Sequence, residues 1–528
     1  MSAYAKLARE PVPQSEPLDA RQAQNNAGGY AFMLDDWRRL ERFLILGSDS
    51  NTYYQKARDL TRENAKCVER CWTENHLRTS QVIRDISLAG RAPKNDAAIF
   101  ALALGALNSD MRTRQAALDA VQVVCRTATH LFQFVDCAKA LGKGRGRAFN
   151  RTIKNWYLLK KPDALAYQMI KYRSREGYDH SRLLKTARPK TKDRAHGALF
   201  RWAVGKQPVD TKQDAALPMQ VHAHIRAMGS TDPAVWAELV REHRLPWEAL
   251  PTAANAEPEV WRALLPTMGL TALVRNLGNM TRLGVIAPLA QETRAACDRI
   301  VDTAEIKKAR LHPFNLLLAH ATYSSGQGFR GQNSWTSVPA VAQALEDAFY
   351  ASFGAWQPSG KRTLVALDVS GSMSSPLMGS PLEVCAGAAA MAMVTARTEQ
   401  EYHVMAFNHG LQGLPVTART SLEEVLRHTR NINGGGTDCA LPMVWALQSK
   451  VPVDVFAIYT DNETWAGSTH ASVALKKYRD KMGIAAKEVV VGMTSTGFTV
   501  ADPDDPGAMD VVGFDSAAPS VIADFARG

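Results

Sequence analysis

Three short segments near the C-terminus carry oxygen-bearing side chains that could hold one metal ion. The first is DVSGS, at the end of the apolar run TLVAL; the second is GGGTD; the third is the aspartate that ends VDVFAIYTD. Carboxylate and hydroxyl oxygens are the ligands that hard divalent cations prefer. We expect Mg²⁺ to be the cofactor, with Mn²⁺ or Ca²⁺ as alternatives. The candidate metal ligands are Asp368, Ser370, Ser372, Thr437 and Asp461.

Other interpretations of these segments are weaker. Serine and aspartate are ordinary residues at a helix start, so DVSGS could be a capping turn alone. The three glycines do not predict a phosphate-binding loop, because no Gly-Lys-Ser/Thr follows them. His403 and His409 lie in or just after another apolar run, and neither is a general base beside a nucleophile. We therefore predict a binding site without catalytic residues, and a protein that is not an enzyme.

Cations concentrate in one stretch of the N-terminal part. Residues 141–195 contain 16 Lys and Arg against 4 Asp and Glu. Cations bind phosphates and aromatic faces stack on unpaired bases, a combination typical of binding to single-stranded or irregular RNA. The alternative is a solvated helix face over core aromatics, which we favour for Trp156 and Tyr167, because aromatics at helical spacing usually pack inward. The interleaved aromatic residues are Phe149, Trp156, Tyr157, Tyr167, Tyr172 and Tyr178.

The run GKGRGR, residues 142–147, has too many glycines for a stable helix and predicts a loop. A flexible basic loop can follow phosphates whose positions differ between RNAs. We expect RNA affinity to depend strongly on salt and little on sequence outside unpaired segments. The loop supplies three candidate RNA contacts: Lys143, Arg145 and Arg147.

Two hydrophobic patterns must position these residues. From about residue 32 to 350, apolar residues recur every three or four positions, which predicts stacked antiparallel helix pairs. After residue 356 short apolar runs follow, several separated by helical stretches: TLVALDV, YHVMAFN, VDVFAIYT, KEVVVGM and MDVVGF. Such runs predict a mostly parallel sheet covered on both faces, with ligands at the carboxyl ends of its strands. We expect an α-helical module followed by an α/β Rossmann-like domain over roughly 360–528.

Length and charge agree with this division. The 528 residues, with 46% hydrophobic and 22% charged, suffice for at least two globular units. The formal net charge is +11, but from Lys361 onward there are 13 Lys and Arg against 18 Asp and Glu, a net −5. Residues 1–360 therefore hold 50 against 34, a net +16. The basicity belongs to the helical module and favours an acidic partner such as nucleic acid.

The remaining features concern the setting of the protein. Seven scattered cysteines do not make a disulfide framework, and we expect Cys67 and Cys71 to be ordinary helix cysteines. No apolar run approaches the roughly 18 residues of a membrane span, and the N-terminus has no apolar signal segment. We expect a soluble, cytoplasmic protein with no membrane partner, whose residues 1–28 form a mobile N-terminal arm.

The C-terminal pattern resembles a von Willebrand factor A domain with a metal-ion-dependent adhesion site. The resemblance is carried by DVSGS, GGGTD and the aspartate after VDVFAIYT, in that order at strand ends. It implies that Ser370, Ser372 and Thr437 coordinate the ion directly, and that Asp368 and Asp461 lie close by or act through water. It also implies that an acidic group from a partner fills the open sixth position.

The N-terminal part is similar to the TROVE module of the Ro ribonucleoprotein autoantigen family. With the A domain directly after it, the resemblance covers nearly everything from about residue 25 and indicates a bacterial-type member, with TROVE at 29–356 and the A domain at 360–528. It implies HEAT-like helical repeats folded into a monomeric ring that the A domain closes. Four stretches carry it in family order: GYAFMLDDWRRLERFLILGSDSNTYY (29–54), KYRSREGYDHSRLL (171–184), EVWRALLPTMGLTALVRNLGNMTRLGV (259–285) and HPFNLLLAHATYSSGQGFRG (312–331).

The same resemblance implies a function. The ring would bind small noncoding Y RNA on an outer basic surface and single-stranded 3′ ends of misfolded or immature RNA in its central hole. It would act in RNA quality control, rRNA and noncoding-RNA maturation and the stress response, with an exoribonuclease such as polynucleotide phosphorylase. The outer candidates are Lys171, Arg175 and His180, extended by Arg182, Lys185, Arg188 and Lys190. The inner candidates are Arg275, Asn276, Asn279 and Arg282, for which helix packing is an equal alternative.

One position departs from the family pattern. Ala187 stands where another member carries a histidine, so that RNA contact is expected to be weakened or moved to His180.

Two other functions compete with RNA binding. A metal-dependent hydrolase or nuclease is disfavoured because hydroxyls make up three of the five candidate ligands, whereas two-metal nucleases need converging carboxylates. An adhesion-type scaffold that uses the A domain would leave the basic helical region without a partner.

Overall fold

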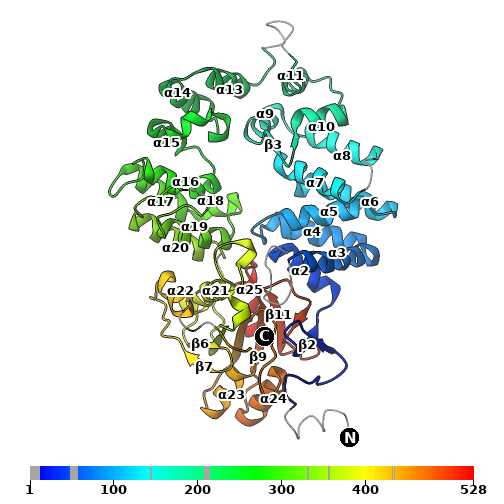
Figure 1. Ribbon diagram of the computed structural model, residues 1–528, viewed down its shortest axis with the longest axis vertical. Coiled ribbons are helices and arrows are strands. Elements are labelled where there is room, and N and C mark those ends of the chain that lie inside the picture. Colours follow the sequence, from blue (N-terminus) through cyan, green and yellow to red (C-terminus); the bar gives the residue numbers. More distant parts are fainter. Residues whose placement is uncertain are drawn as a thin grey trace.

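The computed structural model describes residues 12–47, 57–142, 146–206, 215–329, 332–354, 357–430, 432 and 434–528. Its helices form an elongated ring above one α/β domain (Figure 1). The chain ascends one limb of the ring and returns along the other. The first limb comprises α2 (Asp36–Leu46), α3 (Ala57–Glu74), α4 (His76–Ala89), α5 (Asp96–Ala106), α6 (Met111–Val124), α7 (Ala128–Ala140), α8 (Arg147–Leu158), α9 (Pro162–Lys171), α10 (His180–Ala187) and α11 (Arg194–Ala203), with a short hairpin of β3 (Ser174–Arg175) and β4 (Tyr178–Asp179).

The second limb returns towards the α/β domain. It comprises α13 (Met219–Gly229), α14 (Pro233–His243), the 3-10 turns η1 (Trp247–Ala249) and η2 (Thr252–Ala256), α15 (Pro258–Leu264), α16 (Leu270–Arg282), α17 (Gln291–Val301), α18 (Thr303–Ala309), α19 (Pro313–Ser324) and α20 (Pro339–Ala351).

The helices stack in pairs, as the apolar spacing predicts. From α2 to α5 each helix contacts the next but one as well as its neighbour: α3 contacts α5, α4 contacts α6, and α5 contacts α7. Polar residues fix where helices begin, because side chains such as Asp110 and Asp179 accept hydrogen bonds from the N–H groups of Thr113 and Arg182. The predicted helix cysteines Cys67 and Cys71 are buried in α3.

The C-terminal domain is a six-stranded sheet in the order β11-β9-β8-β5-β6-β7, parallel except for β7. All five predicted strands are confirmed to within two residues at either end. Among the described residues of this domain, only the short β7 and β10 were not predicted, and β10 lies outside the six-stranded sheet. The strands are β5 (Thr363–Asp368), β6 (Tyr402–Phe407), β7 (Leu411–Gly413), β8 (Val455–Thr460), β9 (Lys487–Gly492), β10 (Phe498–Thr499) and β11 (Ala508–Val512). The helices are α21 (Val384–Thr398), α22 (Leu422–Arg430), α23 (Leu441–Gln448), α24 (Ala471–Met482) and α25 (Ala518–Arg527).

Helices cover both faces of this sheet. Alternate residues of a strand point to opposite faces, so Val365 and Leu367 of β5 pack in a different core from Leu364 and Ala366. The first core includes α21 and is continuous with the core of the helical ring, whereas the second lies under α23 and α24. The predicted fold class is therefore confirmed: a helical module followed by an α/β domain.

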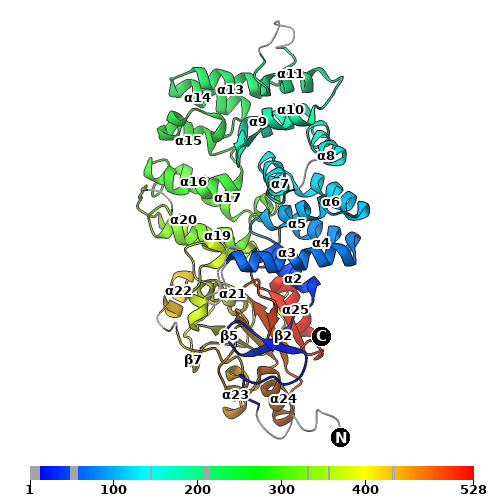
Figure 2. The same ribbon diagram turned by 45° about the vertical axis from the view of Figure 1, so that its right-hand side comes forward.

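The prediction of a mobile arm over residues 1–28 is wrong for residues 12–28, while residues 1–11 lie outside the described residues. This segment crosses the α/β domain, where it forms β1 (Gln22–Gln24) against β2 (Tyr30–Met33), and β2 pairs with β10 (Figure 2). The Gln14 N–H donates to the Gly467 carbonyl at 3.2 Å, and the Tyr30 N–H donates to the Gln14 carbonyl at 3.1 Å. Backbone pairing therefore holds it, without the apolar run that sequence patterns detect.

The two limbs of the ring also meet directly. Side chains near the start of α19 donate to backbone carbonyls at the end of α4 and just after it: Arg310 Nε to Leu88 at 2.8 Å, His312 Nε2 to Arg91 at 3.0 Å, and Asn315 Nδ2 to Pro93 at 3.2 Å. The Arg91 guanidinium binds both carboxylate oxygens of Asp515 in the α/β domain. The ring is thus closed by contact between its own ends as well as by the α/β domain.

None of the helices in the described ranges combines the length and apolarity that crossing a membrane requires.

Arg42 of α2 provides a test of the junction with the α/β domain. Its buried guanidinium pairs with Asp510 and donates to the carbonyls of Thr496 and Phe498, at 3.2 and 2.8 Å. Arg42→Ala would leave these acceptors unpaired, so we expect a loss of about 3–5 kcal/mol in the free energy of unfolding, measured by denaturant titration.

Arg38→Ala is the matched control, because Arg38 is 54% exposed and pairs with Glu41 on the same helix at 3.4 Å. We expect it to cost at most about 1 kcal/mol. Equal effects of the two substitutions would contradict a structural role for the buried arginine.

Candidate metal centre and RNA-binding surface

Four of the five candidate metal ligands lie at the carboxyl ends of two adjacent strands. Asp368 is the last residue of β5, and Asp461 follows β8, with which β5 pairs. After β5 the chain turns through η3 (Gly371–Ser374), and the Ser370 N–H donates to Asp368 Oδ1 at 2.9 Å. Ser370 Oγ lies 3.1 Å from Ser372 Oγ. The spacing in DVSGS thus brings a carboxylate and two hydroxyls together on one loop.

A glycine loop places Thr437 beside this group. The Gly434 N–H donates to the Val369 carbonyl at 2.8 Å, and the Gly371 N–H donates to the Gly435 carbonyl at 3.3 Å. Gly434 and Gly435 have φ values of 132° and 86°, which L side chains rarely adopt. Gly434 and Gly435 therefore serve close backbone packing against the loop after β5.

The buried carboxylates of this group favour a cation. Burial raises the pKa of Asp368 to about 7, and the nearby Asp461 carboxylate contributes in the same direction. Thr460 Oγ1 donates to Asp368 Oδ2 at 2.6 Å, whereas Asp461 Oδ2 is buried without a hydrogen-bond partner. Nowhere in the described residues, this group included, do three His, Cys, Asp or Glu side chains converge as metal ligands do, so any cation held here would need the hydroxyls as well. A hard cation would offset the repulsion and satisfy the orphaned oxygen, so the residues present fit such an ion.

Sequence patterns did not indicate that an N-terminal segment supports this group through the loop after Asp461. Asn26 Nδ2 donates to Glu463 Oε1 at 2.6 Å, and the Ala27 N–H donates to Glu463 Oε2 at 3.2 Å. Asn25 Nδ2 donates to the Thr464 carbonyl at 2.7 Å. The segment NNAGG, residues 25–29, therefore clamps the loop that begins at Asp461. The amides and glycines of this segment were the only feature of the sequence that could have indicated the clamp.

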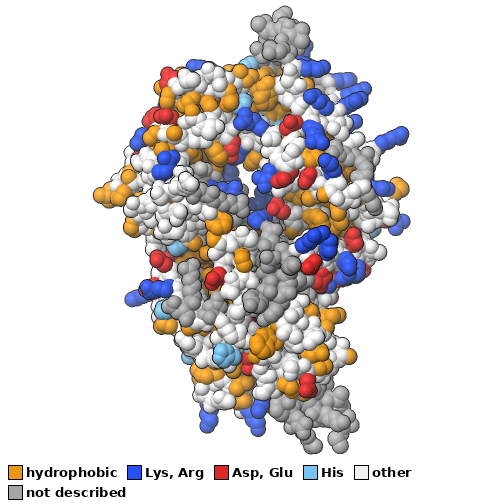
Figure 3. All heavy atoms as spheres, viewed as in Figure 1, with side chains coloured by type: hydrophobic (Ala, Val, Ile, Leu, Met, Phe, Trp, Pro, Cys, Tyr) orange, Lys and Arg blue, Asp and Glu red, His pale blue; other side chains and the backbone are white. Residues whose placement is uncertain are grey.

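Exposed cations gather on the first limb around β3 and α10. Arg175, Arg182, Lys185, Arg188 and Lys190 are all exposed, and we call these five residues the outer basic surface. Arg182 lies over the Tyr178 ring at 4.5 Å, and Arg175 pairs with Glu176 at 3.0 Å. Lys185 and Lys190 form no ion pair with any carboxylate in the described ranges. Figure 3 shows Lys and Arg side chains over this upper part of the limb.

His180 does not belong to this surface. It is 5% exposed, and both of its ring nitrogens have partners inside the protein: the Tyr157 hydroxyl and the Tyr172 carbonyl, each at 3.0 Å. Burial lowers the pKa of His180 to about 4. Ala187 is buried on the same helix, so His180 does not take over an RNA contact from position 187. The prediction of His180 as an RNA contact is wrong, because α10 turns it into the core.

The other candidates take different positions. Lys171, at the end of α9, is half-buried, and its Nζ donates to the Tyr167 hydroxyl at 3.2 Å. Arg147 is exposed at the start of α8, whereas Lys143 and Arg145 lie outside the described residues. The core interpretation is confirmed for Trp156, but Tyr167 is only half-buried. The structure thus separates Lys171 from the exposed cations with which it was grouped.

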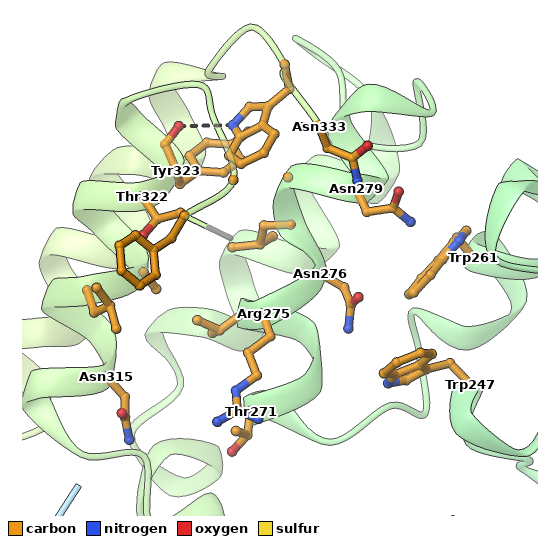
Figure 4. Close-up of a pocket in the computed structure, with 18 of the residues that line it drawn as sticks. Trp247, Trp261, Thr271, Arg275, Asn276, Asn279, Asn315, Thr322, Tyr323 and Asn333 are labelled. Atoms are coloured by element: carbon orange, nitrogen blue, oxygen red, sulfur yellow. Dashed lines mark hydrogen bonds between the residues drawn. The ribbon is translucent and has the colours of Figure 1, made fainter. Parts of the chain in front are cut away.

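The candidates on α16 line a cavity of about 560 Å³ in the second limb (Figure 4). Arg275, Asn276 and Asn279 line it, whereas Arg282 is exposed and donates to Asn279 Oδ1 at 2.8 Å. Two tryptophans on its wall, Trp247 and Trp261, carried no sequence signal of their own, because aromatics at helical spacing are usually core residues.

The arrangement defines a class of protein: a ring of paired helices on an A domain, with buried hydroxyls and carboxylates at the strand ends and exposed cations on the ring. The family model of the TROVE domain matches residues 23–216 and 239–327, and that of the Ro60 vWA domain matches residues 362–526. The chain belongs to the Ro60 family, as a member of bacterial type.

Known relatives match along nearly their whole length. The chain is 42% identical to RNA-binding protein RO60 of Deinococcus radiodurans over 520 residues, which are 98% of this chain and 97% of that one. It is 34% identical to RNA-binding protein RO60 of Caenorhabditis elegans, over 98% of this chain and 91% of the relative. The crystal structure of the Deinococcus radiodurans RO (RSR) protein matches with a TM-score of 0.67 and 40% identity, over 93% of this chain and 99% of that one.

Gly29 provides a test of the clamp behind the strand-end group. A Cβ at Gly29 would lie 2.1 Å from the Thr464 carbonyl oxygen, so the backbone must move apart in Gly29→Ala. We expect a cost of about 1–3 kcal/mol in local stability, measured as faster hydrogen exchange in residues 12–33 and 461–470.

Gly229→Ala is the control, because no atom lies within 4 Å of a Cβ at the end of α13. Unchanged exchange at residues 461–470 in Gly29→Ala would show that the clamp does not hold the loop.

Proposed function

We propose that this chain is an RNA-binding protein whose outer basic surface holds small noncoding Y RNA. The observation that carries the proposal is the group of exposed cations around α10, from Arg175 to Lys190, in a chain whose relatives are named RNA-binding proteins. Five cations on one side of the ring supply the field that attracts a phosphate backbone. The net charge of +16 on residues 1–360 acts in the same direction.

The second part of the proposal concerns the centre of the ring. Figure 3 shows a hollow between the two limbs with Lys and Arg side chains in its depth. Single-stranded 3′ ends of misfolded or immature RNA enter this hole, while the structured part of the RNA stays outside. Arg275 and Asn276 on α16 are the inner contacts.

The protein performs no chemistry in this proposal. It acts in the cytoplasm as a monomeric ring in RNA quality control, rRNA and noncoding-RNA maturation and the stress response, and presents RNA to an exoribonuclease such as polynucleotide phosphorylase. The family membership and the closed ring support this role.

The third part concerns the strand-end group of the A domain. Ser370, Ser372 and Thr437 hold a divalent cation, preferably Mg²⁺, with Asp368 and Asp461 close by. When bound, the ion supplies an electropositive point that an acidic group of a partner can complete. The orphaned buried oxygen of Asp461 supports this assignment.

Charge reversal on the outer basic surface tests the first part. Replacing Arg175, Lys185 and Lys190 by Glu should weaken binding of a hairpin RNA with a single-stranded 3′ tail at least about tenfold in gel-shift titrations. The slope of log affinity against log salt should fall by roughly 0.7–0.9 for each phosphate that the variant no longer neutralises.

The control carries the same change of charge on another domain: Lys476→Glu, Lys477→Glu and Lys481→Glu, all on the exposed side of α24. If both triple variants lose affinity equally, the surface around α10 is not the binding site. If pure wild-type protein cuts the RNA, the protein is an enzyme.

Calorimetric titration tests the metal assignment. Asp368→Ala combined with Ser370→Ala should abolish the heat of Mg²⁺ or Mn²⁺ binding, because it removes two oxygen-bearing side chains of the group. Ser374→Ala is the control, since the exposed Ser374 hydroxyl donates to the Gly371 carbonyl on the same loop. Equal heats for the wild type and the double variant would overturn the assignment.

A further inference from the structure

We infer that two arginines, one from each limb of the ring, form a binding site for a small phosphate dianion such as inorganic phosphate. Arg126 lies between α6 and α7 in the first limb, and Arg310 follows α18 in the second limb. Neither arginine belongs to the outer basic surface or lines the cavity along α16. The inference therefore does not depend on the binding of RNA.

Both guanidinium groups are held on the last turn of α4. Arg126 Nη1 donates to Ser87 Oγ at 2.8 Å, and Arg310 Nε donates to the carbonyl of the next residue, Leu88, at 2.8 Å. The Arg310 side chain also lies against Gly90, the C-cap of α4, where an added Cβ would be 3.0 Å from that of Arg310. Two charges from opposite limbs thus share one turn of helix.

A chain of hydrogen bonds fixes the position of Arg126. Ser87 Oγ donates to Asn95 Oδ1 at 2.8 Å, and Asn95 Nδ2 donates to the Val124 carbonyl at 2.9 Å. The Ser87 hydroxyl has given its hydrogen to Asn95, so towards Arg126 it can act only as an acceptor. This contact uses one terminal nitrogen of the guanidinium group and leaves Nε and Nη2 for a ligand.

The two arginines have no counter-charge. Neither forms an ion pair within the part of the chain that the structure describes. Burial lowers the pKa of Arg126, and repulsion by Arg310 acts in the same direction. The Asp515 carboxylate is not available to them, because Arg91 binds both of its oxygens. A half-buried cation beside a second cation is unfavourable unless an anion joins them.

The chemistry of the two side chains selects the ligand. A guanidinium group can offer two parallel N–H donors to two oxygens of a phosphate. One phosphate dianion balances the charge of both arginines, whereas each phosphodiester group of an RNA backbone carries a single charge. Arg310 is exposed and Arg126 half-buried, so a small ion can reach both from solvent.

A phosphate held by both arginines would add a bridge between the limbs. Such a ligand contacts both side chains only while the limbs are together, so it should bind the closed ring more tightly than an open one. The site would therefore link the concentration of a small anion to the closure of the ring.

Calorimetric titration of the full chain with inorganic phosphate tests the inference, at constant ionic strength and with EDTA to remove divalent cations. We expect saturable binding to the wild type. Arg126→Gln and Arg310→Gln should each weaken it about tenfold or more, because each removes one pair of charge-assisted hydrogen bonds. Glutamine at position 126 keeps an N–H donor for the Ser87 hydroxyl, and Arg310 is exposed, so both variants should fold.

Matched controls remove the same charge from the same two parts of the chain. Arg114→Gln changes a half-buried arginine of α6, and Lys308→Gln changes an exposed lysine of α18. Both should bind phosphate like the wild type. Equal losses in all four variants would show that phosphate responds to net charge alone, and would overturn the assignment to Arg126 and Arg310.

Hydrogen exchange of the wild type is a second measurement that needs no substitution. Phosphate should slow exchange in residues 85–95 and 303–316, which belong to different limbs, and chloride at the same ionic strength should not. Equal protection by chloride would reduce the effect to screening and overturn the inference. So would the absence of both heat and protection.

Gel-shift titration with the hairpin RNA distinguishes a free phosphate from RNA. We expect Arg126→Gln and Arg310→Gln to bind this RNA within about twofold of the wild type. If phosphate does not bind and both variants lose affinity for RNA, the two arginines are RNA contacts and the inference is wrong. If the wild type binds phosphate but no RNA, the phosphate site stands and the proposed function fails.

Discussion

The architecture depends on one half-buried arginine at the place where three parts of the chain meet. Arg91 lies just after α4 of the first limb, and its guanidinium pairs with Asp515 of the A domain. Its backbone carbonyl accepts the hydrogen bond from His312 at the start of α19, in the second limb. The buried Asp515 carboxylate needs such a partner, because removing the guanidinium would leave an uncompensated buried charge. The contact therefore holds the ring closed, and the inner hole has a fixed shape only while it is closed.

The N-terminal segment makes a second set of contacts between the ring and the A domain. Residues 25–29 clamp the loop after Asp461, and β2 follows them and pairs with β10 of the A domain. Helix α2 comes next and inserts Arg42 among the carbonyls of the β10 region. The segment from residue 25 to α2 therefore contacts the A domain before the chain continues into the other helices of the ring. The A domain and the ring are therefore joined by these contacts as well as by the linker between them.

The sequence predicted what parallel sheets and helical periodicity determine. The strand-end group could be predicted from the sequence. Parallel strands bring their carboxyl ends to one edge of the sheet, so three separated segments must meet there. The orientation of α10 was not predicted from the sequence. His180 lies among basic residues in the sequence, yet it faces the core because it is on the same side of the helix as Leu184 and Ala187. The docking of residues 12–28 was also missed, because backbone pairing with Gly467 and β2 leaves no hydrophobic pattern.

The two proposed RNA sites differ in the range of the forces that they use. The outer basic surface acts through charge, which reaches about 8–10 Å in physiological salt and does not distinguish bases. The proposed inner contacts on α16 act on an unpaired strand at contact distance, and Arg275 adds a salt-dependent part. A structured RNA without a free end meets only the first, and a short single strand only the second. An RNA that carries both engages both sites of one closed ring, so the second contact is made at high effective concentration. Under this proposal, selection for structured RNA with an unpaired tail needs no recognition of any sequence in the duplex.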